Sequence, residues 1–199
     1  TQLTGDVFYL KTSDFSDELD AIADILIKDE KEKYQNSILT IEKILNRYPD
    51  NSKAQDLKGK LLGRLKSYDD AIKYYNSLIE LNGQKDYYYG ELGYVYYKSG
   101  DKSKALENII KAIDIDPKND FNFFRRAQFF EEEEEYEKAL ADYNKAIEID
   151  PDDMVYLNHR AVLYQIDLDN YEKALVDYLR IIELDKDQEF AKKNYLYKF

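Results

Sequence analysis

The chain repeats itself every 34 residues, and this period constrains its fold more than any other feature. Its three prolines, Pro49, Pro117 and Pro151, are separated by 68 and 34 residues. Small and aromatic residues keep the same step elsewhere, in sets such as Ala71, Ala105 and Ala139, and Tyr34, Tyr68 and Tyr136. Because several unrelated residue types follow one spacing, the sequence predicts a tandem array of similar structural repeats.

Each repeat contains two apolar stretches with helical spacing. Ala139, Tyr143 and Ala146, for example, lie three or four residues apart and would share one face of a helix. Gly100 indicates a turn inside one repeat, and Pro117 ends a second helix because proline cannot continue it. We therefore predict five helix hairpins at residues 18–51, 52–85, 86–119, 120–153 and 154–188, the last of them longer by one residue near 168–170.

Two of these repeats carry a recognisable pattern of aromatic, small and proline positions. The third repeat has it at Tyr89, Leu92, Gly93, Tyr96, Ala105, Ile109, Ala112 and Pro117. The fourth has it at Phe123, Ala127, Phe130, Ala139, Tyr143, Ala146 and Pro151. Over residues 18–188 the chain resembles the tetratricopeptide repeat family. The resemblance implies an all-α fold, a right-handed superhelical solenoid of helix-turn-helix repeats.

Some positions depart from the family pattern. Lys58, Arg126 and Arg160 stand where the family has Leu, and Gly83 and Lys186 replace Pro.

Other positions have a structural interpretation. Small residues let paired helices approach closely at Gly59, Gly93, Ala127 and Ala161, and again at Ala71, Ala105, Ala139 and Ala174. Aromatic core slots are predicted at Tyr34, Tyr68, Tyr75, Tyr89, Tyr96, Phe123, Phe130, Tyr136, Tyr143, Tyr164, Tyr171 and Tyr178.

The two ends lie outside the five repeats. Residues 1–17 are interpreted as an N-terminal arm with an apolar patch at residues 7–10, which is either loosely docked or lies in the groove of this or a neighbouring molecule. Residues 189–199 are interpreted as a C-terminal capping helix, because a repeat array needs a cap at each end.

Composition excludes several classes of function. A formal net charge of -12 disfavours nucleic acids and anionic membranes as partners. No apolar run approaches the roughly 18 residues that span a bilayer. The chain has no Cys and a single His, His159, so neither a thiolate nor a multi-histidine metal site is available. We expect no metal, no cofactor and no enzymatic activity.

We expect a soluble protein, with a cytoplasmic location favoured over a cell-envelope or secreted one. Because the sequence does not begin with Met, a trimmed N-terminus remains open.

An unbroken acidic run spans residues 131–135. Its simplest interpretation is a solvated helix end and turn. The alternative is a docking point for a basic partner, since negative charge at a helix C-terminus opposes the helix dipole.

The resemblance also implies which residues contact a partner. In this family the first helix of each repeat lines the concave face through fixed positions. In this sequence those positions hold Tyr87, Tyr94, Tyr97, Lys98, Phe121, Phe124, Arg125, Gln128, Asn158 and His159, followed by Gln165. Tyr, Phe and Arg are typical of binding hot spots, which favours recognition of a partner segment in this groove.

One well-known subclass binds the acidic tails of heat-shock chaperones with Lys, Asn and Arg at set positions. Lys60 and Arg125 match two of them, but Asp56, Glu91 and Phe121 occupy others, and two cations are too few to hold two carboxylates. We therefore expect a scaffold for another protein or peptide, with a basic partner favoured by the acidic surface. The alternatives are an assembly subunit that self-associates through its ends, or the interaction domain of a larger complex.

Overall fold

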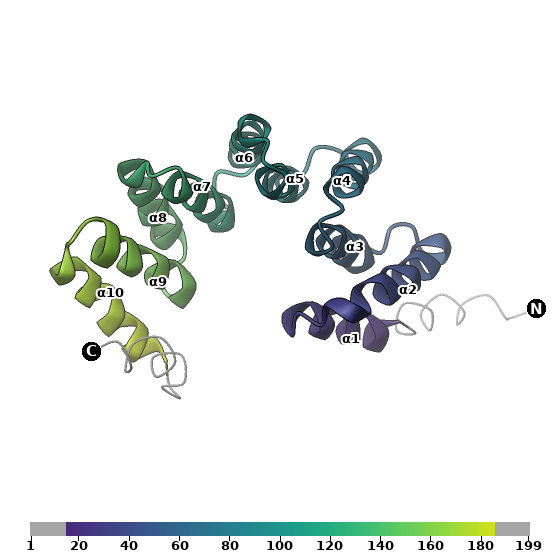
Figure 1. Cartoon of the computed structure of the whole chain (residues 1–199), viewed down its shortest axis with the longest axis horizontal. Coiled ribbons are helices and arrows are strands. Elements are labelled where there is room, and N and C mark those ends of the chain that lie inside the picture. Colours follow the sequence, from purple (N-terminus) through teal and green to yellow (C-terminus); the bar gives the residue numbers. More distant parts are fainter. Residues whose placement is uncertain (1–14, 186–199) are drawn as a thin grey trace, which may run out of the picture. The chain divides into compact units, whose positions relative to one another are not determined.

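The computed structural model describes residues 15–185, and all regular elements in this range are helices (Figure 1). Within it, the predicted all-α class is confirmed. The α-helices are α1 (Ser16–Ile27), α2 (Tyr34–Arg47), α3 (Ser52–Arg64), α4 (Tyr68–Asn82), α5 (Asp86–Ser99), α6 (Lys102–Ile115), α7 (Asp120–Glu132), α8 (Tyr136–Ile149), α9 (Met154–Val162) and α10 (Tyr171–Leu184). A short 3-10 helix spans Lys31–Lys33, and a π-helical turn spans Leu163–Asp167.

The chain divides into two compact units, residues 1–77 and 78–199. In compact unit 1, α1, α2 and α3 share a core that includes Leu19, Ile41 and Leu61, all nearly inaccessible to solvent. The boundary falls inside α4. The predicted arm at 1–17 lies almost entirely outside the described residues, and so does the capping helix at 189–199.

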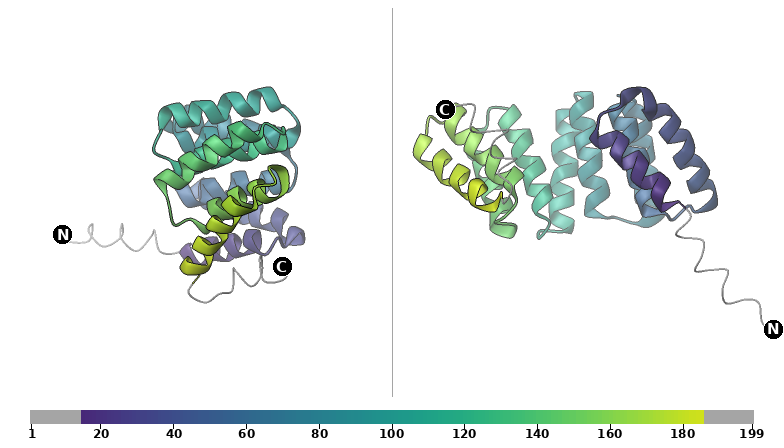
Figure 2. Two further views of the ribbon diagram at one scale, coloured as in Figure 1. Left: turned by 90° about the vertical axis from the view of Figure 1, so that its left-hand side faces the viewer. Right: turned by 90° about the horizontal axis from the view of Figure 1, so that it is seen from below.

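In compact unit 2, α5 pairs with α6, α7 with α8, and α9 with α10 (Figure 1, Figure 2). Each pair is a hairpin, and α6 and α8 also contact the first helix of the hairpin that follows. Two of these three hairpins begin with capping residues that satisfy exposed backbone N–H groups. Asn119 and Asp153 accept hydrogen bonds at the starts of α7 and α9.

Glycine permits close packing inside two hairpins. A Cβ atom on Gly93 would lie 2.7 Å from the Ile109 side chain and 3.1 Å from the Ala105 carbonyl oxygen. A Cβ atom on Gly59 would overlap the Tyr75 ring at 2.3 Å. Ala71, Ala105, Ala139 and Ala174 are all buried. The predicted small-residue contacts are therefore confirmed.

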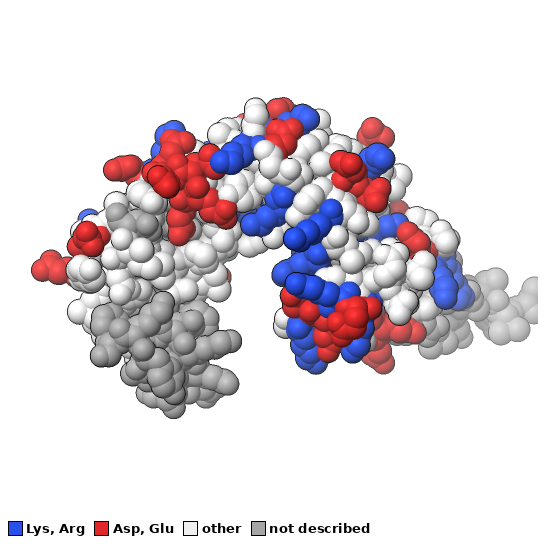
Figure 3. Space-filling model, viewed as in Figure 1, with Lys and Arg blue, Asp and Glu red and all other residues white. Residues whose placement is uncertain are grey.

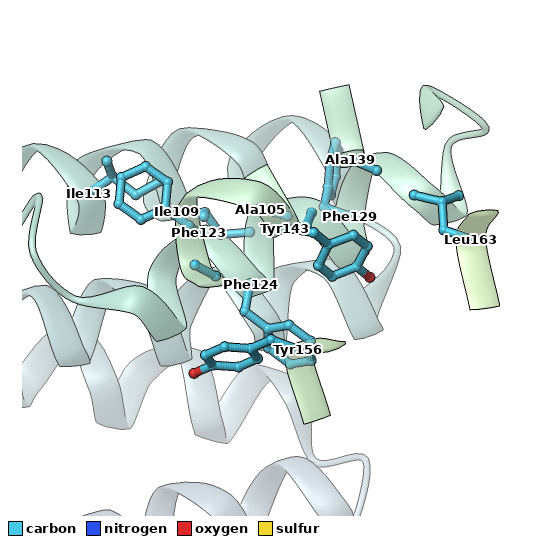
Figure 4. Close-up of a cluster of buried hydrophobic side chains, with 12 residues drawn as sticks. Ala105, Ile109, Ile113, Phe123, Phe124, Phe129, Ala139, Tyr143, Tyr156 and Leu163 are labelled. Carbon is cyan, nitrogen blue, oxygen red and sulfur yellow. The ribbon is translucent and has the colours of Figure 1, made fainter. Parts of the chain in front are cut away.

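The largest core cluster of compact unit 2 lies between α6, α7, α8 and α9. Figure 4 shows its aromatic side chains, with Phe124 beside Tyr156 and with Tyr143 and Phe129 nearby. The core positions predicted at Tyr34, Tyr75, Phe123, Tyr143, Tyr164 and Tyr178 are buried.

Tyr171 was wrongly predicted as a core residue, since it is 60% exposed at the start of α10. Two other tyrosines are buried although the repeat pattern did not single them out. Tyr88 packs edge-on against Tyr87, and Tyr156 packs against Phe124.

Two of the departures at the family's Leu position are explained by a partner on the second helix of the same hairpin. Arg126 donates from Nε and Nη2 to the two carboxylate oxygens of Asp142, at 2.7 and 2.8 Å. Arg160 forms the same bidentate pair with Asp177, at 2.9 and 2.6 Å. Both carboxylates are buried, so each needs its cation.

The third departure at the Leu position, Lys58, also has a carboxylate partner, but this partner belongs to the preceding helix α2. Lys58 pairs with Glu42 at 2.9 Å and lies 5.1 Å from the centre of the Tyr74 ring. In the third repeat, where Leu is retained as Leu92, the facing position holds the uncharged Asn108. From one repeat to another, the residue at the facing position of the second helix therefore changes together with the residue at the Leu position of the first helix.

The additional residue of the fifth repeat coincides with the π-helical turn at Leu163–Asp167. A π-turn contains one residue more than an α-helical turn, and here it forms the end of the first helix, before Leu168. Leu163 and Tyr164 remain buried in this turn, and Ile166 is exposed. Finally, no helix among the described residues combines the length and apolar character needed to cross a bilayer.

Candidate protein-binding groove

The first helices of the three hairpins in compact unit 2 are tied together near their N-termini. Asn122 of α7 donates to the Asp86 carboxylate of α5 at 3.2 Å, and Asn119 donates to the same oxygen at 2.7 Å. One repeat later, the Tyr156 hydroxyl of α9 donates to Asp120 of α7 at 2.7 Å. These links repeat with the 34-residue period and hold α5, α7 and α9 in a row. Burial and the Asp120 carboxylate raise the pKa of Tyr156, so its hydroxyl stays a donor.

A cavity of about 180 Å³ opens between α5 and α7, with α6 behind it. Five of the ten predicted groove residues line it: Tyr94, Tyr97, Lys98, Arg125 and Gln128. Ile109, Phe129 and Glu132 complete the wall. Of these three, Ile109 and Phe129 are core residues that also present atoms to the cavity.

Arg125 lines the cavity and contacts residues of both α5 and α7. Its guanidinium donates to the buried carboxylate of Glu91 on α5. The rings of Tyr94 and Phe121 lie 4.9 and 4.6 Å from the guanidinium carbon. The charge of Arg125 is thus compensated and its planar group is held between two rings, while Tyr94 and Phe121 remain 38% and 41% exposed.

The rim of the cavity is formed by Tyr97, Lys98 and Glu132. The Tyr97 hydroxyl donates to Glu132, and Lys98 lies 3.9 Å from the other oxygen of that carboxylate. Burial and the neighbouring carboxylate raise the pKa of Tyr97, so the phenol stays protonated. The Lys98 ammonium also lies 5.1 and 5.5 Å from the ring centres of Tyr97 and Tyr94. The rim therefore offers one cation and one carboxylate.

Phe124 does not line the cavity. It is 6% exposed, because its ring packs 4.8 Å from that of Tyr156 and 5.9 Å from that of Tyr143 (Figure 4). His159 is partly buried beside it, with its Nδ1 atom 3.5 Å from the Tyr143 hydroxyl, and burial lowers the pKa of the imidazole. The geometry thus makes Phe124 a core residue and gives His159 contacts within the fold.

The other predicted positions are not part of the cavity lining. Tyr87 is partly buried at the start of α5 and packs against Tyr88. Asn158 is partly buried on α9, and Gln165 accepts a hydrogen bond from the Tyr178 hydroxyl at 2.7 Å. Phe121 is exposed next to the cavity and stacks on Phe124.

The acidic run at 131–135 pairs mainly within the chain. Glu131 accepts from the Tyr143 hydroxyl, and Glu132 contacts Tyr97 and Lys98 as described above. Glu133 pairs with Lys102 at 2.6 Å, and Glu135 pairs with Lys138. Carboxylates also gather over the α7 and α8 region of the surface (Figure 3). The run thus joins the end of α7 to its neighbours. Glu132 borders the cavity although the sequence pattern did not predict it, because an unbroken acidic run is typical of a solvated helix end.

Among the described residues there is no group of three or more His, Cys, Asp or Glu arranged to hold a metal ion. The residues that line the cavity offer apolar and aromatic surface, one amide side chain, and two oppositely charged pairs, Arg125 with Glu91 and Lys98 with Glu132.

Comparison with curated proteins identifies relatives of limited extent. A segment of 70 residues is 40% identical to the mitochondrial import receptor subunit TOM70 of Saccharomyces cerevisiae, over 35% of this chain and 11% of that protein. A segment of 64 residues is 36% identical to human serine/threonine-protein phosphatase 5, over 32% and 13% of the two chains. A third relative is the TPR repeat-containing protein MJ1428 of Methanocaldococcus jannaschii, 30% identical over 102 residues, 46% and 17% of the two chains. The chain matches less than a fifth of the length of each.

Solved structures resemble the fold over most of its length. The protein TTC0263 of Thermus thermophilus aligns with a TM-score of 0.70 at 17% identity, covering 88% of this chain and 96% of that one. MamA aligns with a TM-score of 0.60 at 20% identity, covering 83% and 95%. YrrB aligns with a TM-score of 0.55 at 18% identity, covering 94% and 95%.

Family models assign the repeats directly. Models described as tetratricopeptide repeat match residues 52–85, 87–119, 123–153 and 156–188. Together with the paired helices and the similar structures, these matches confirm the resemblance seen in the sequence. The chain belongs to the tetratricopeptide repeat family, whose repeats form scaffolds for protein–protein interaction.

Proposed function

We propose that compact unit 2 binds an extended or helical segment of a partner protein along α5, α7 and α9. The segment is anchored by one apolar side chain in the cavity between α5 and α7. The observation that carries this proposal is the position of the cavity. It is lined by half of the residues that the family pattern assigns to partner contact.

The cavity's size and lining favour an aliphatic or aromatic anchor. An apolar cavity of roughly 150 Å³ accepts a benzene ring, and this one measures about 180 Å³. Ile109 and Phe129 supply apolar surface, and Tyr94 supplies an exposed ring face. Gln128 supplies an amide that is suited to hydrogen bonding with the backbone of a bound segment.

An acidic tail fits this site poorly. Arg125 already pairs with the buried Glu91, and Lys98 faces Glu132. A carboxylate ligand would have to break these pairs and leave Glu91 uncompensated in the interior, which is costly. The site therefore differs in chemistry from a clamp for C-terminal carboxylates.

The surrounding charge favours a basic partner. Residues 78–185 contain 25 Asp and Glu against 13 Lys and Arg, whereas residues 15–77 contain 12 against 11. The excess of negative charge is thus concentrated in the compact unit that carries the cavity. Such an asymmetry attracts basic partners and speeds their encounter. Among the structurally similar proteins, YrrB is described as a TPR protein with an unusual peptide-binding site, which supports peptide recognition on this type of fold.

A peptide library displayed on phage and selected against the immobilised chain tests the proposal. We expect selected peptides to share a large apolar residue near basic residues. Their affinity should fall at least about tenfold in a Tyr94→Ala/Phe121→Ala variant, because both exposed rings lie beside the anchor.

The matched control replaces two exposed apolar residues of α6, as Ile110→Ala/Ile115→Ala. It should bind the peptides as the unmodified chain does, measured by fluorescence polarisation. If the α6 variant loses the peptides and the groove variant retains them, the binding surface lies on the second helices and the proposal is wrong.

A further inference from the structure

A second cleft lies in compact unit 1, between α2, α3 and α4. Its volume is about 370 Å³, within the usual range of ligand-binding clefts. Ile38 of α2 supplies apolar surface, as do Leu62 and Leu65 of α3, and all three belong to or pack on the core of this compact unit. The lining residues lie between positions 35 and 74, so the cleft is a property of compact unit 1 alone.

In the three following repeats an aromatic ring fills the corresponding place. Leu62 occupies the position that Tyr96, Phe130 and Tyr164 hold one, two and three repeats later. Tyr96 and Phe130 pack against the largest core cluster of compact unit 2, and Tyr164 is buried. The second repeat thus has a smaller side chain at this position, and the space of the ring is left open as part of the cleft.

A lysine at one fixed position of the second helix covers each of these rings. Its ammonium lies between 5.2 and 5.3 Å from the ring centre, as a cation–π contact, in the pairs Lys104 with Tyr96, Lys138 with Phe130 and Lys173 with Tyr164. In the second repeat the same position holds Asp70, which lines the cleft. The charge is therefore reversed where the ring is missing.

Asp70 is the one charge in the lining that no other lining residue balances. The remaining two charged residues, Lys58 and Glu42, pair with each other at 2.9 Å, and Lys58 also lies over the ring of Tyr74. Asp70 is exposed, and within the described part of the chain it forms no ion pair. A ligand in the cleft therefore meets apolar surface beside one available carboxylate.

We propose that this cleft binds a segment of a partner protein that supplies the two missing groups, an aromatic side chain against Leu62 and a lysine or arginine beside Asp70. The aromatic side chain takes the place that Phe130 fills in the fourth repeat. The cation takes the place of Lys138, and its charge is balanced by Asp70. Complementary charge selects a basic residue over a neutral or acidic one. The site is separate from the groove of compact unit 2 and does not depend on it.

Titration with synthetic peptides tests the proposal. The probes are alanine-based decapeptides with one Phe and one Arg, Gln or Glu, separated by zero to three residues, and NMR titration of the isotope-labelled chain measures their affinities. The Tyr94→Ala/Phe121→Ala variant serves as the parent chain, so that the groove of compact unit 2 does not contribute. At the best spacing, the Arg peptide should bind about threefold more tightly than its Gln counterpart, as expected for an exposed ion pair, and the Glu peptide should bind most weakly. Equal affinities for Arg and Gln at every spacing would overturn the proposal.

Two variants test the missing groups directly. Asp70→Asn should abolish the preference for Arg over Gln. Asp69→Asn is the matched control, because it removes the same charge one residue away and outside the lining, and it should keep the preference. Leu62→Phe/Asp70→Lys introduces the ring and the cation of the fourth repeat and should weaken binding of the Arg peptide at least about tenfold. If this double variant does not fold, the two Asn variants decide alone: equal losses in both would attribute the preference to net charge and contradict the site.

Photo-cross-linking identifies the occupant of the cleft. The chain contains no cysteine, so Ser67→Cys provides a single thiol in the lining for a benzophenone label. With the Arg peptide present, the main photoproduct should join the label to that peptide, as identified by mass spectrometry. A main product joined to residues 1–14 or to a second copy of the chain would show that the chain itself occupies the cleft, and the assignment to a partner segment would be wrong.

Discussion

At the level of single residues, departures from the family pattern are compensated inside the hairpin. The arginines at the usual Leu position could be seen in the sequence, but the pattern alone did not show why they are tolerated. The reason is a buried carboxylate 16 or 17 residues later, which the structure places opposite the guanidinium. A bidentate pair of this kind satisfies both groups, and the Asp142 hydrogen bonds raise the pKa of Arg126 further.

This compensation predicts a specific pattern of stabilities. Arg126→Leu should lower the free energy of unfolding by about 2 kcal/mol, because it leaves the Asp142 carboxylate buried without its cation. The double variant Arg126→Leu/Asp142→Asn reproduces the Leu92 and Asn108 combination of the third repeat and should regain most of the loss. Urea denaturation measures both values. A double variant as unstable as the single one would show that the pair contributes by packing and not by compensation of charge.

A second prediction at this scale concerns the turn between α7 and α8. Glu134 adopts a left-handed backbone conformation with φ of 60°, at the position where the third repeat has Gly100 with φ of 94°. Non-glycine residues are strained there. Glu134→Gly should therefore raise the free energy of unfolding by about 0.5–1 kcal/mol, measured by urea denaturation. Glu134→Ala removes the charge but keeps the Cβ atom, so it should give no such gain; an equal gain in both variants would attribute the effect to charge.

At the level of elements, the helices were predictable because each one repeats the same arrangement of small and apolar residues. The hairpins follow from this arrangement. Position 93, for instance, accepts only glycine, because a Cβ atom there would clash with Ile109 and the Ala105 carbonyl oxygen. The π-helical turn of the fifth repeat was not predictable as such. The sequence shows one additional residue, but whether it lengthens a loop or widens a helix depends on which side chains must stay buried, here Leu163 and Tyr164.

The candidate groove was predictable in part for a related reason. Family positions describe which side of a first helix faces the groove, and Tyr94, Tyr97 and Arg125 follow them. Phe124 does not, because the neighbouring first helix presents the ring of Tyr156, against which Phe124 packs. Which ring turns inward is decided by contacts between adjacent repeats, and these are not visible in the sequence of one repeat.

At the level of the whole molecule, stability is expected to be local. Repeats of this kind contact only their neighbours, so the free energy is approximately a sum over hairpins and the interfaces between them. A terminal helix, which has a neighbour on one side only, is therefore expected to be held less firmly than an inner one. Only Leu19 and Ile22 of α1 are buried, whereas α3 buries five residues, from Ala54 to Leu61. The end of compact unit 1 is therefore expected to open before its interior does.

A core substitution in α1 tests how far such opening spreads. Leu19→Ala should remove about 2–4 kcal/mol of packing from the cluster shared by α1, α2 and α3, because the side chain is 2% exposed. Hydrogen exchange should accelerate strongly in α1 and α2, less in α3, and not at all in α7 and α8 of compact unit 2. Ile27→Ala serves as the control, because Ile27 lies on the same helix but is 80% exposed, and it should alter exchange little. Uniform acceleration across both compact units after Leu19→Ala would mean that the array unfolds as a single cooperative body, and the additive description of its repeats would then be wrong.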